Sequence, residues 1–207
     1  MAGHIPVLLE ESIEGLSIKE DGVYLDLTLG RGGHGEAILR KLSPKGRLIA
    51  FDLDQTAIDE GRERLSKVGG DFLLIHDNFA SFPEHLGELG IGGVDGILAD
   101  LGVSSPQFDD GERGFSYRFD APLDMRMDVG QTLSAREVVN CYSLAELTRV
   151  IGVYGEEKGA YRIARSIIAS RPIETTFQLV EAIKKAKSAK ELSAKEIGRA
   201  CRWTIGR

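Results

Sequence analysis

A short apolar strand that runs directly into a cluster of glycines is the feature that most constrains the fold of this 207-residue chain. Val23 to Leu29 is rich in aliphatic and β-branched residues, as buried strands are. Four glycines then lie between positions 30 and 35, and Glu36–Leu42 has apolar residues at helical spacing. Glycine permits positive φ and close approach of a ligand, and the N-terminus of a helix offers free N–H groups. The pattern predicts a nucleoside-cofactor site at the edge of an α/β sheet.

An acidic residue after the second strand leaves two classes of cofactor open. Asp52 follows the strand-like run Arg47–Phe51, twenty residues after Gly32. At that position its carboxylate can accept hydrogen bonds from both hydroxyls of a ribose. The glycine spacing also satisfies G-x-G-x-x-G, which with an acid about 20 residues later is typical of dinucleotide-binding folds. NAD is therefore one candidate cofactor, and S-adenosylmethionine (SAM) is the other.

Three features favour SAM over NAD. Asp26 lies inside the first strand, where an acid suits a ligand with a cationic amino-acid end and would repel a pyrophosphate. The sequence His-Asp-Asn-Phe at 76–79 follows a third strand-like run, Phe72–Ile75, and offers polar groups and a ring to an adenine. Asp100 follows a fourth apolar strand, Gly96–Ala99, again at a carboxyl edge where ligands of open α/β sheets bind.

The composition is that of a globular protein, with 42% hydrophobic and 28% charged residues. There is no apolar run near 18 residues and no charged-then-apolar leader, so the sequence predicts no membrane span, no secretory signal and a cytoplasmic location. Cys141 and Cys201 lack metal-ligand spacing, and we expect reduced thiols and no metal site. The net charge is −6, but Lys184–Arg207 holds eight basic residues against two Glu, which is compatible with RNA contact or with a solvated helix face.

The pattern changes after about residue 106. Strand–helix alternation up to Leu101 gives four strands, which predicts an α/β fold with an incomplete sheet. Gln107–Gly130 has no clean period and is expected to be a structured loop. Helical periodicity follows, with expected helices at Ser134–Tyr142, Ser143–Tyr154, Glu157–Ser170 and Thr175–Lys187. Ser134 with Glu137, and Ser143 with Glu146, have the spacing of capping boxes.

Two motifs after the fourth strand carry a resemblance to a known family. DLGVSSPQFDD at 100–110 and ERGFSYRFDAPLDMRMD at 112–128 closely resemble the bacterial RsmH/MraW family. These are SAM-dependent methyltransferases that act on the N4 of a cytidine in small-subunit ribosomal RNA. The opening His-x-Pro-Val-Leu-Leu at 4–9, the Gly30–His34 loop, Tyr-Gly-Glu-Glu-Lys at 154–158 and Pro-Ile-Glu-Thr-Thr at 172–176 are also similar to that family. The resemblance covers roughly residues 4–186.

The resemblance implies a Rossmann-like methyltransferase domain at 1–110, an inserted loop and helical substrate-recognition domain at 111–187, and a divergent basic tail at 188–207. It implies SAM as cofactor and small-subunit ribosomal RNA or the 30S particle as partner, with a homodimer as a possible assembly. The residues expected to hold SAM by this resemblance are Gly32, Gly33 and His34 at the methionine part, Asp52 at the ribose, Phe79 at the adenine, and Asp100 and Gln107 elsewhere in the pocket.

The family pattern is expected to stop after Ala186. Relatives continue with motifs that return the chain to the sheet, whereas this sequence reads KSAKELSAKEIGRACRWTIGR and ends. We therefore expect a truncated chain, or a tail read in a different frame. The principal hypothesis is an rRNA cytosine-N4 methyltransferase present as a partial chain. The alternative is a non-catalytic relative that binds SAM or RNA.

The expected chemistry makes Asp100 the candidate catalytic residue. The N4 lone pair of cytosine is delocalised into the ring, so the site must accept a hydrogen bond from N4–H, and Asp100 lies nearest the expected methyl position. Residues 104–106 are further candidate acceptors. Rings and cations interleave in the loop that follows and suggest an RNA-gripping surface, made of Arg113, Phe115, Tyr117, Arg118, Arg126 and Arg136. An ion pair of Arg126 with Asp124 or Asp128 is the equal alternative. Tyr142, Tyr154 and Tyr161 are expected in the core or at hinges.

Overall fold

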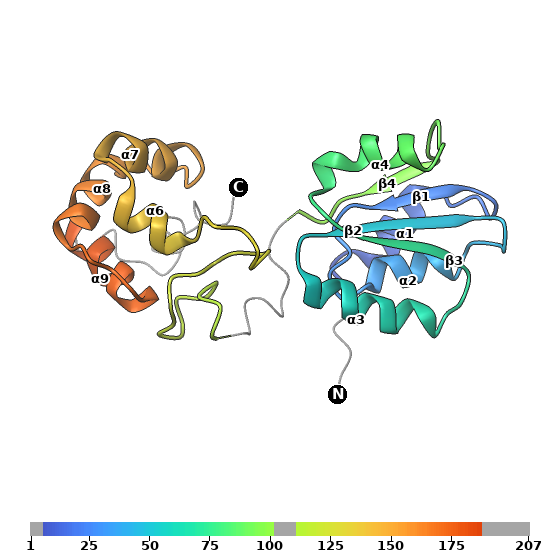
Figure 1. The fold of residues 1–207 in the computed structure, drawn as a ribbon, viewed down its shortest axis with the longest axis horizontal. Helices are drawn as coiled ribbons and strands as arrows, with labels where there is room; N and C mark the ends of the chain where they lie inside the picture. Colours follow the sequence, from blue (N-terminus) through green and yellow to red (C-terminus); the bar gives the residue numbers. More distant parts are fainter. Residues whose placement is uncertain (1–5, 102–110, 188–207) are drawn as a thin grey trace. The chain divides into compact units, whose positions relative to one another are not determined.

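The computed structural model describes residues 6–101 and 111–187. The chain divides into two compact units, Met1–Leu101 and Gly102–Arg207. The first unit is built around a sheet and the second around helices, and each is described below by itself (Figure 1).

The first unit contains a four-stranded parallel sheet. Its strands are β1 (Val23–Asp26), β2 (Arg47–Asp52), β3 (Asp71–His76) and β4 (Gly96–Leu98). They lie in the order β3-β2-β1-β4. The chain thus adds strands first on one side of β1 and then, with β4, on the other, as in one half of a doubly wound fold. The predicted α/β class with about four strands is confirmed.

Helices cover both faces of this sheet. They are α1 (Leu9–Leu16), α2 (Gly33–Leu39), α3 (Gln55–Ser66), the short 3-10 helix η1 (Phe79–Ser81) and α4 (Phe82–Glu88). Alternate residues of β2 point to opposite faces, as the pleat requires. Leu48 and Ala50 pack with buried residues of α1, α2 and α3, whereas Ile49 and Phe51 pack with Leu86 of α4. Both faces are therefore buried, which explains the nearly continuous apolar strands.

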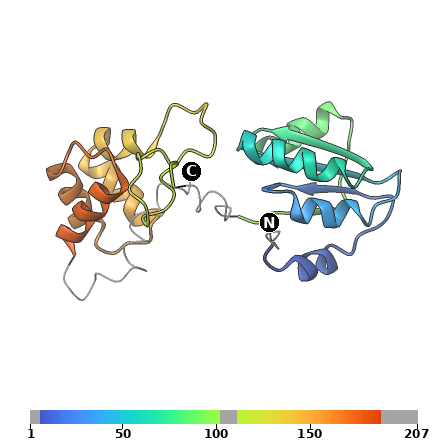
Figure 2. The same ribbon diagram turned by 90° about the horizontal axis from the view of Figure 1, so that it is seen from below.

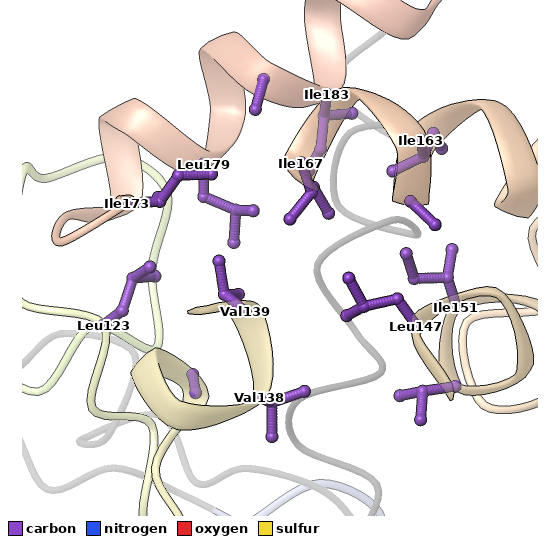
Figure 3. Packing of buried hydrophobic residues seen from close by; sticks show 14 of the residues in the cluster. Leu123, Val138, Val139, Leu147, Ile151, Ile163, Ile167, Ile173, Leu179 and Ile183 are labelled. Carbon is purple, nitrogen blue, oxygen red and sulfur yellow. The ribbon is translucent and has the colours of Figure 1, made fainter. Parts of the chain in front are cut away.

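Over residues 111–187, the second unit contains four helices after an irregular segment. The helices are α6 (Ala135–Cys141), α7 (Leu144–Val153), α8 (Ala160–Ala169) and α9 (Thr176–Ala186), and they pack around one apolar core (Figures 2 and 3). Capping boxes begin α6 and α7, as predicted, and a third, Thr175 with Gln178, begins α9. Each satisfies N–H groups at the start of its helix.

The segment 111–130 is an irregular but ordered part of this unit. It has no helix, and its one bridge joins Pro122 to Thr175. Phe115, Leu123 and Met125 are buried in the same core as the helices, and Figure 3 shows Leu123 beside Val139 and Ile173. The predicted structured loop is therefore confirmed over the residues that the structure describes.

Two predicted helix boundaries are wrong for local reasons. The helix expected from Glu36 begins at Gly33, because Gly32 adopts a left-handed conformation and ends the turn three residues earlier. The helix expected from Glu157 begins at Ala160. The Glu157 carboxylate accepts the Gly159 N–H at 2.8 Å and so holds that residue in the preceding turn.

Across residues 6–101 and 111–187, every helix is too short or too polar to cross a membrane.

Candidate functional site

The strand order of the first unit locates its candidate ligand site. The order reverses between β1 and β4, and open α/β sheets bind ligands at the carboxyl ends of strands at such a switch point. Two hydrogen bonds join the loops there: Leu27 N–H donates to the Leu98 carbonyl at 2.9 Å, and Asp100 N–H donates to Thr28 Oγ1 at 2.7 Å. The backbone of Asp100 is thus held beside the end of β1.

Asp26, the last residue of β1, is a buried carboxylate with one unused oxygen. Its Oδ1 accepts the Thr28 N–H at 3.1 Å, while Oδ2 is buried and has no hydrogen-bond partner. The pKa of Asp26 is raised to about 7, mainly by burial and also by the nearby charges of Asp52 and Asp100, while the Thr28 hydrogen bond acts in the opposite direction. A cationic group at Oδ2 would stabilise the ionised form.

His34, in the first turn of α2, presents a second unused polar atom. The residue is buried, and its Nε2 has no hydrogen-bond partner. The third atom of this kind in the described part of the chain is Arg47 Nε, which lies 3.2 Å from an Asp71 carboxylate oxygen in an ion pair. Because buried polar atoms are rarely left unpaired, Asp26 and His34 mark a place for a polar ligand.

The two glycines before His34 are required for different reasons. Gly32 has φ 71° and caps α2 in a left-handed conformation. Gly33 has an ordinary φ, but a Cβ at this position would lie 2.3 Å from Pro6 Cγ. Gly33 therefore allows the segment before α1 to pack on the start of α2, a contact that the sequence analysis missed.

Asp52 fixes the glycine turn. Its Oδ2 accepts the Gly30 N–H at 2.8 Å and its Oδ1 accepts the Asp54 N–H at 2.9 Å. Burial raises the pKa of Asp52, while its hydrogen bonds to backbone N–H groups oppose that shift. Each carboxylate oxygen has a second lone pair, so these bonds leave it capacity to accept ribose hydroxyls.

The loop after β3 is held by side-chain hydrogen bonds. Asp77 accepts from Asn78 N–H at 2.7 Å and from Ser81 Oγ at 2.8 Å, and its Oδ2 lies 2.9 Å from His85 Nε2. The hydrogen bond with His85 is the main cause that lowers the pKa of Asp77 to about 2. Phe79 follows in η1 and is half-buried against the apolar cluster on the α4 side of the sheet.

The predicted site residues are therefore only partly brought together. Gly32, Gly33 and His34 lie at the start of α2, and hydrogen bonds connect Asp52 to the glycine turn and Asp100 to the β1 loop. Phe79 lies after β3, and Gln107, like residues 104–106, lies outside the described residues. The sequence analysis missed Thr28. An acid followed two residues later by Thr is a signal for it, because Asp side chains often accept the N–H of residue i+2.

In the second unit, three cations of the predicted RNA-gripping surface are bound internally. Arg126 makes a bidentate pair with Asp124, at 2.6 and 2.8 Å. Arg113 lies over the ring of buried Phe115 and donates to two carbonyl groups of the same loop, and Arg136 pairs with Glu174. The structural alternative for Arg126 is thus confirmed. The RNA-gripping interpretation is wrong for Phe115, because its ring is buried. For Arg113 and Arg136 it stays a prediction, and the ion pair of Arg136 with Glu174 is exposed.

The three tyrosines differ in burial. Tyr142 is half-buried against the helical core, as expected. Tyr154 follows α7 as its C-cap residue and Tyr161 lies in the first turn of α8, and both are exposed, so neither is a core residue. Their place at hinges stays a prediction.

Comparison with known proteins matches nearly the whole chain. A model of the MraW methylase family matches residues 1–202. A ribosomal RNA small subunit methyltransferase H of Mesoplasma florum is 56% identical over 193 residues, which are 93% of this chain and 62% of the relative. The protein of that name from Clostridioides difficile is 53% identical and matches 88% of this chain. The chain spans about three fifths of the length of these relatives, 62% and 60%.

Among solved structures, an rRNA methylase from Streptococcus thermophilus is similar over 40% of this chain and 50% of its own, with 26% identity and a TM-score of 0.34. A likeness of this extent supports no further conclusion.

Proposed function

Because the chain belongs to the MraW methylase family, we propose that it takes part in SAM-dependent methylation of the N4 amino group of a cytidine in small-subunit ribosomal RNA. The observation that carries the proposal is the pair of buried, unpartnered polar atoms, Asp26 Oδ2 at the end of β1 and His34 Nε2 in the first turn of α2.

These atoms fit the polar end of SAM. Its methionine part carries an ammonium group, and an ionised Asp26 is a suitable acceptor for that cation. His34 can donate to or accept from the same part of the ligand through Nε2. The charges that act on Asp26 are those of Asp52 and Asp100, so a dinucleotide pyrophosphate would meet several acids at this edge. The site therefore favours SAM over NAD.

The remaining cofactor contacts follow the family resemblance. Asp52 would hold the ribose hydroxyls, and Gly32 and Gly33 would let the chain pass close to the methionine part. Phe79, fixed on the loop braced by Asp77, would lie against the adenine. Gln107 would complete the pocket.

Asp100 is the proposed catalytic residue. When bound, SAM supplies an electrophilic methyl group, and the transfer is an in-line displacement that depends on positioning. The Asp100 carboxylate is exposed, and its backbone is fixed by Thr28. It can accept the N4–H hydrogen bond of cytosine and so favour the pyramidal amine that attacks the methyl group, and can then take up the proton.

The proposed substrate is ribosomal RNA, free or in the 30S particle. The target base must leave its stack to reach the methyl group, which favours an unpaired region. Of the predicted loop residues, Tyr117 and Arg118 are exposed, and so is the neighbouring Phe119. This aromatic–cation–aromatic sequence is the part of the loop that we propose contacts RNA. An RNA substrate fits the predicted cytoplasmic location. The homodimer stays a prediction, which light scattering of the purified chain would test.

The alternative function is that of a relative that binds SAM or RNA without turnover.

One assay separates these two functions. The chain is incubated with tritiated-methyl SAM and 30S particles that lack the modification. We expect label in the RNA with the wild type, and a loss of at least about 100-fold with Asp100→Ala, in the range of general acid–base effects. Turnover retained within about tenfold would remove Asp100 from the mechanism. Cofactor binding without any label would support the non-catalytic alternative.

A further inference from the structure

Helix α8 carries exposed aromatic and basic side chains. Its aromatic residue is Tyr161, whose exposed fraction is 54%. Its exposed cations are Arg162 and Arg165. We call these three residues the α8 corner.

The corner has the chemistry of a nucleic-acid surface. The Arg165 guanidinium carbon lies 6.0 Å from the centre of the Tyr161 ring, one helical turn away, in cation–π geometry. Helix α8 contains no acidic residue. The opposite face of α8 belongs to the apolar core, because Ile163, Ala164 and Ile167 are buried between α7 and α9 (Figure 3). The exposed Tyr161, Arg162 and Arg165 lie outside this core.

Charge complementarity favours an anionic partner at this unit. Residues 111–187 contain twelve basic residues (Lys and Arg) and ten acidic residues (Asp and Glu). Residues 6–101 contain nine basic and eighteen acidic residues. A ring beside cations binds the bases and phosphates of a single strand together, which a surface with charge alone does not.

We propose that the α8 corner is a contact surface for single-stranded RNA, separate from the loop residues 117–119. Tyr161 stacks on a base, and Arg162 and Arg165 contact the backbone phosphates. This inference rests on the proposed RNA substrate and names a second place where that substrate is held.

The test measures RNA binding by the full chain without cofactor. The probe is a fluorescein-labelled, unstructured RNA of about 12 nucleotides, within the range of sites on single-stranded binding proteins, followed by anisotropy at several salt concentrations. We expect Tyr161→Ala to weaken binding about tenfold, as loss of one stacked base does. Arg165→Gln should reduce the slope of log K against log salt by about 0.7, as loss of one phosphate contact does.

Arg149→Gln is the matched control. Arg149 is exposed on α7, in the same unit but outside the corner, and this variant also removes one positive charge. It should keep the wild-type affinity. Equal effects of Arg165→Gln and Arg149→Gln, or no binding of the RNA by the wild type, would overturn the proposal. If Tyr161→Ala does not fold, the salt slope of Arg165→Gln decides alone.

Two further arms separate the possible failures. S-adenosylhomocysteine binding by each variant reports on the first unit, so a variant that loses RNA and keeps this ligand leaves the proposed cofactor site standing. A labelled glutamate-rich peptide replaces the RNA in the second arm. If the corner variants lose the peptide and keep the RNA, the surface serves an acidic protein and the RNA proposal is wrong.

Discussion

The two units of this chain use their polar side chains in opposite ways. In the first unit, Asp26 at the end of β1 and His34 at the start of α2 each keep a buried polar atom without a partner. In the second unit, Arg113, Arg126 and Arg136 are satisfied within the protein. A polar residue in a motif is therefore direct evidence for a ligand where a buried atom has no partner, as at Asp26 and His34. Where the bonds are filled, as at Arg126, the residue holds the fold.

The largest effect on ligand binding in this comparison is expected at Asp26, whose carboxylate has a buried oxygen without a hydrogen-bond partner. Asp26→Asn should weaken S-adenosylhomocysteine binding at least about tenfold, because a charged hydrogen bond contributes about 1.5–3 kcal/mol. With the pKa of Asp26 near 7, wild-type affinity should also rise between pH 6 and pH 8, as the carboxylate ionises. Calorimetry at several pH values checks both effects. Glu84→Gln, which changes an exposed acid on α4, is the control and should bind as the wild type does.

The same variant has a predictable effect on stability. The pKa of Asp26 is raised on folding, so its contribution is favourable below its unfolded pKa of about 4 and is lost as pH rises through 7. Asp26→Asn should therefore raise the Tm at pH 8 and change it little at pH 4. A lower Tm at pH 8 would mean that the carboxylate is satisfied in the free protein.

Substitutions of Arg126 and Arg118 test whether the internal bonds of Arg126 stabilise the second unit. Arg126 pairs with Asp124 and also donates to the carbonyl groups of Val129 and Gln131, at 2.9 and 2.7 Å. Arg126→Gln should cost about 1–3 kcal/mol of unfolding free energy, seen in thermal melts as a shift of about 2–4 °C per kcal/mol. Arg118→Gln, at an exposed position, should stay within about 0.5 kcal/mol. Equal melts for the two variants would refute the structural role of Arg126.

Substitutions of Gly33 and Gly15 by Ala test whether the segment before α1 packs closely on the start of α2. A Cβ at Gly33 would overlap Pro6, whereas a Cβ at Gly15 meets nothing within 4 Å. Gly33→Ala should destabilise the protein by about 1–2 kcal/mol, as overpacking does. Gly15→Ala should stabilise it by up to about 1 kcal/mol, because Gly15 lies inside α1. Urea titrations check both values. Pro6→Ala should partly rescue Gly33→Ala, and a failure to do so would place the strain elsewhere.

The smallest effect is expected at Asp77. Its pKa is lowered to about 2, so its contribution to stability is present above its unfolded pKa of about 4 and is lost as pH falls toward 2. Because the residue is well exposed to solvent, Asp77→Asn should cost less than about 1 kcal/mol at pH 7. The difference in Tm between wild type and variant should shrink between pH 5 and pH 3. A difference that stays constant with pH would assign the effect to the neutral hydrogen bonds.

The sequence predicted those parts of the site that depend on local pattern. Apolar runs predicted the four strands, and Asp52 ends β2 as expected. The first strand was expected to continue to Leu29 but ends at Asp26, and β4 ends at Leu98, two residues before Asp100. Contacts between distant residues were not predictable in this way. The Asp100–Thr28 bond spans 72 residues, and the Pro6–Gly33 contact joins the start of the chain to α2.

The second unit shows a different limit of sequence analysis. Interleaved rings and cations have the same composition whether they contact RNA or brace a loop. Only the partners of Arg126 and the burial of Phe115 separate the two interpretations. An acid two residues before the arginine, as Asp124 is here, is the one local signal that favours the brace.

Calorimetric titration of S-adenosylhomocysteine into the purified chain, with NADH as the comparison ligand, tests the central claim most directly. Our account predicts one adenosyl ligand bound per chain, no saturable signal with NADH, and weaker binding by Asp26→Asn. A folded chain that binds neither ligand, or that binds NADH alone, would contradict the assignment of this switch point to SAM.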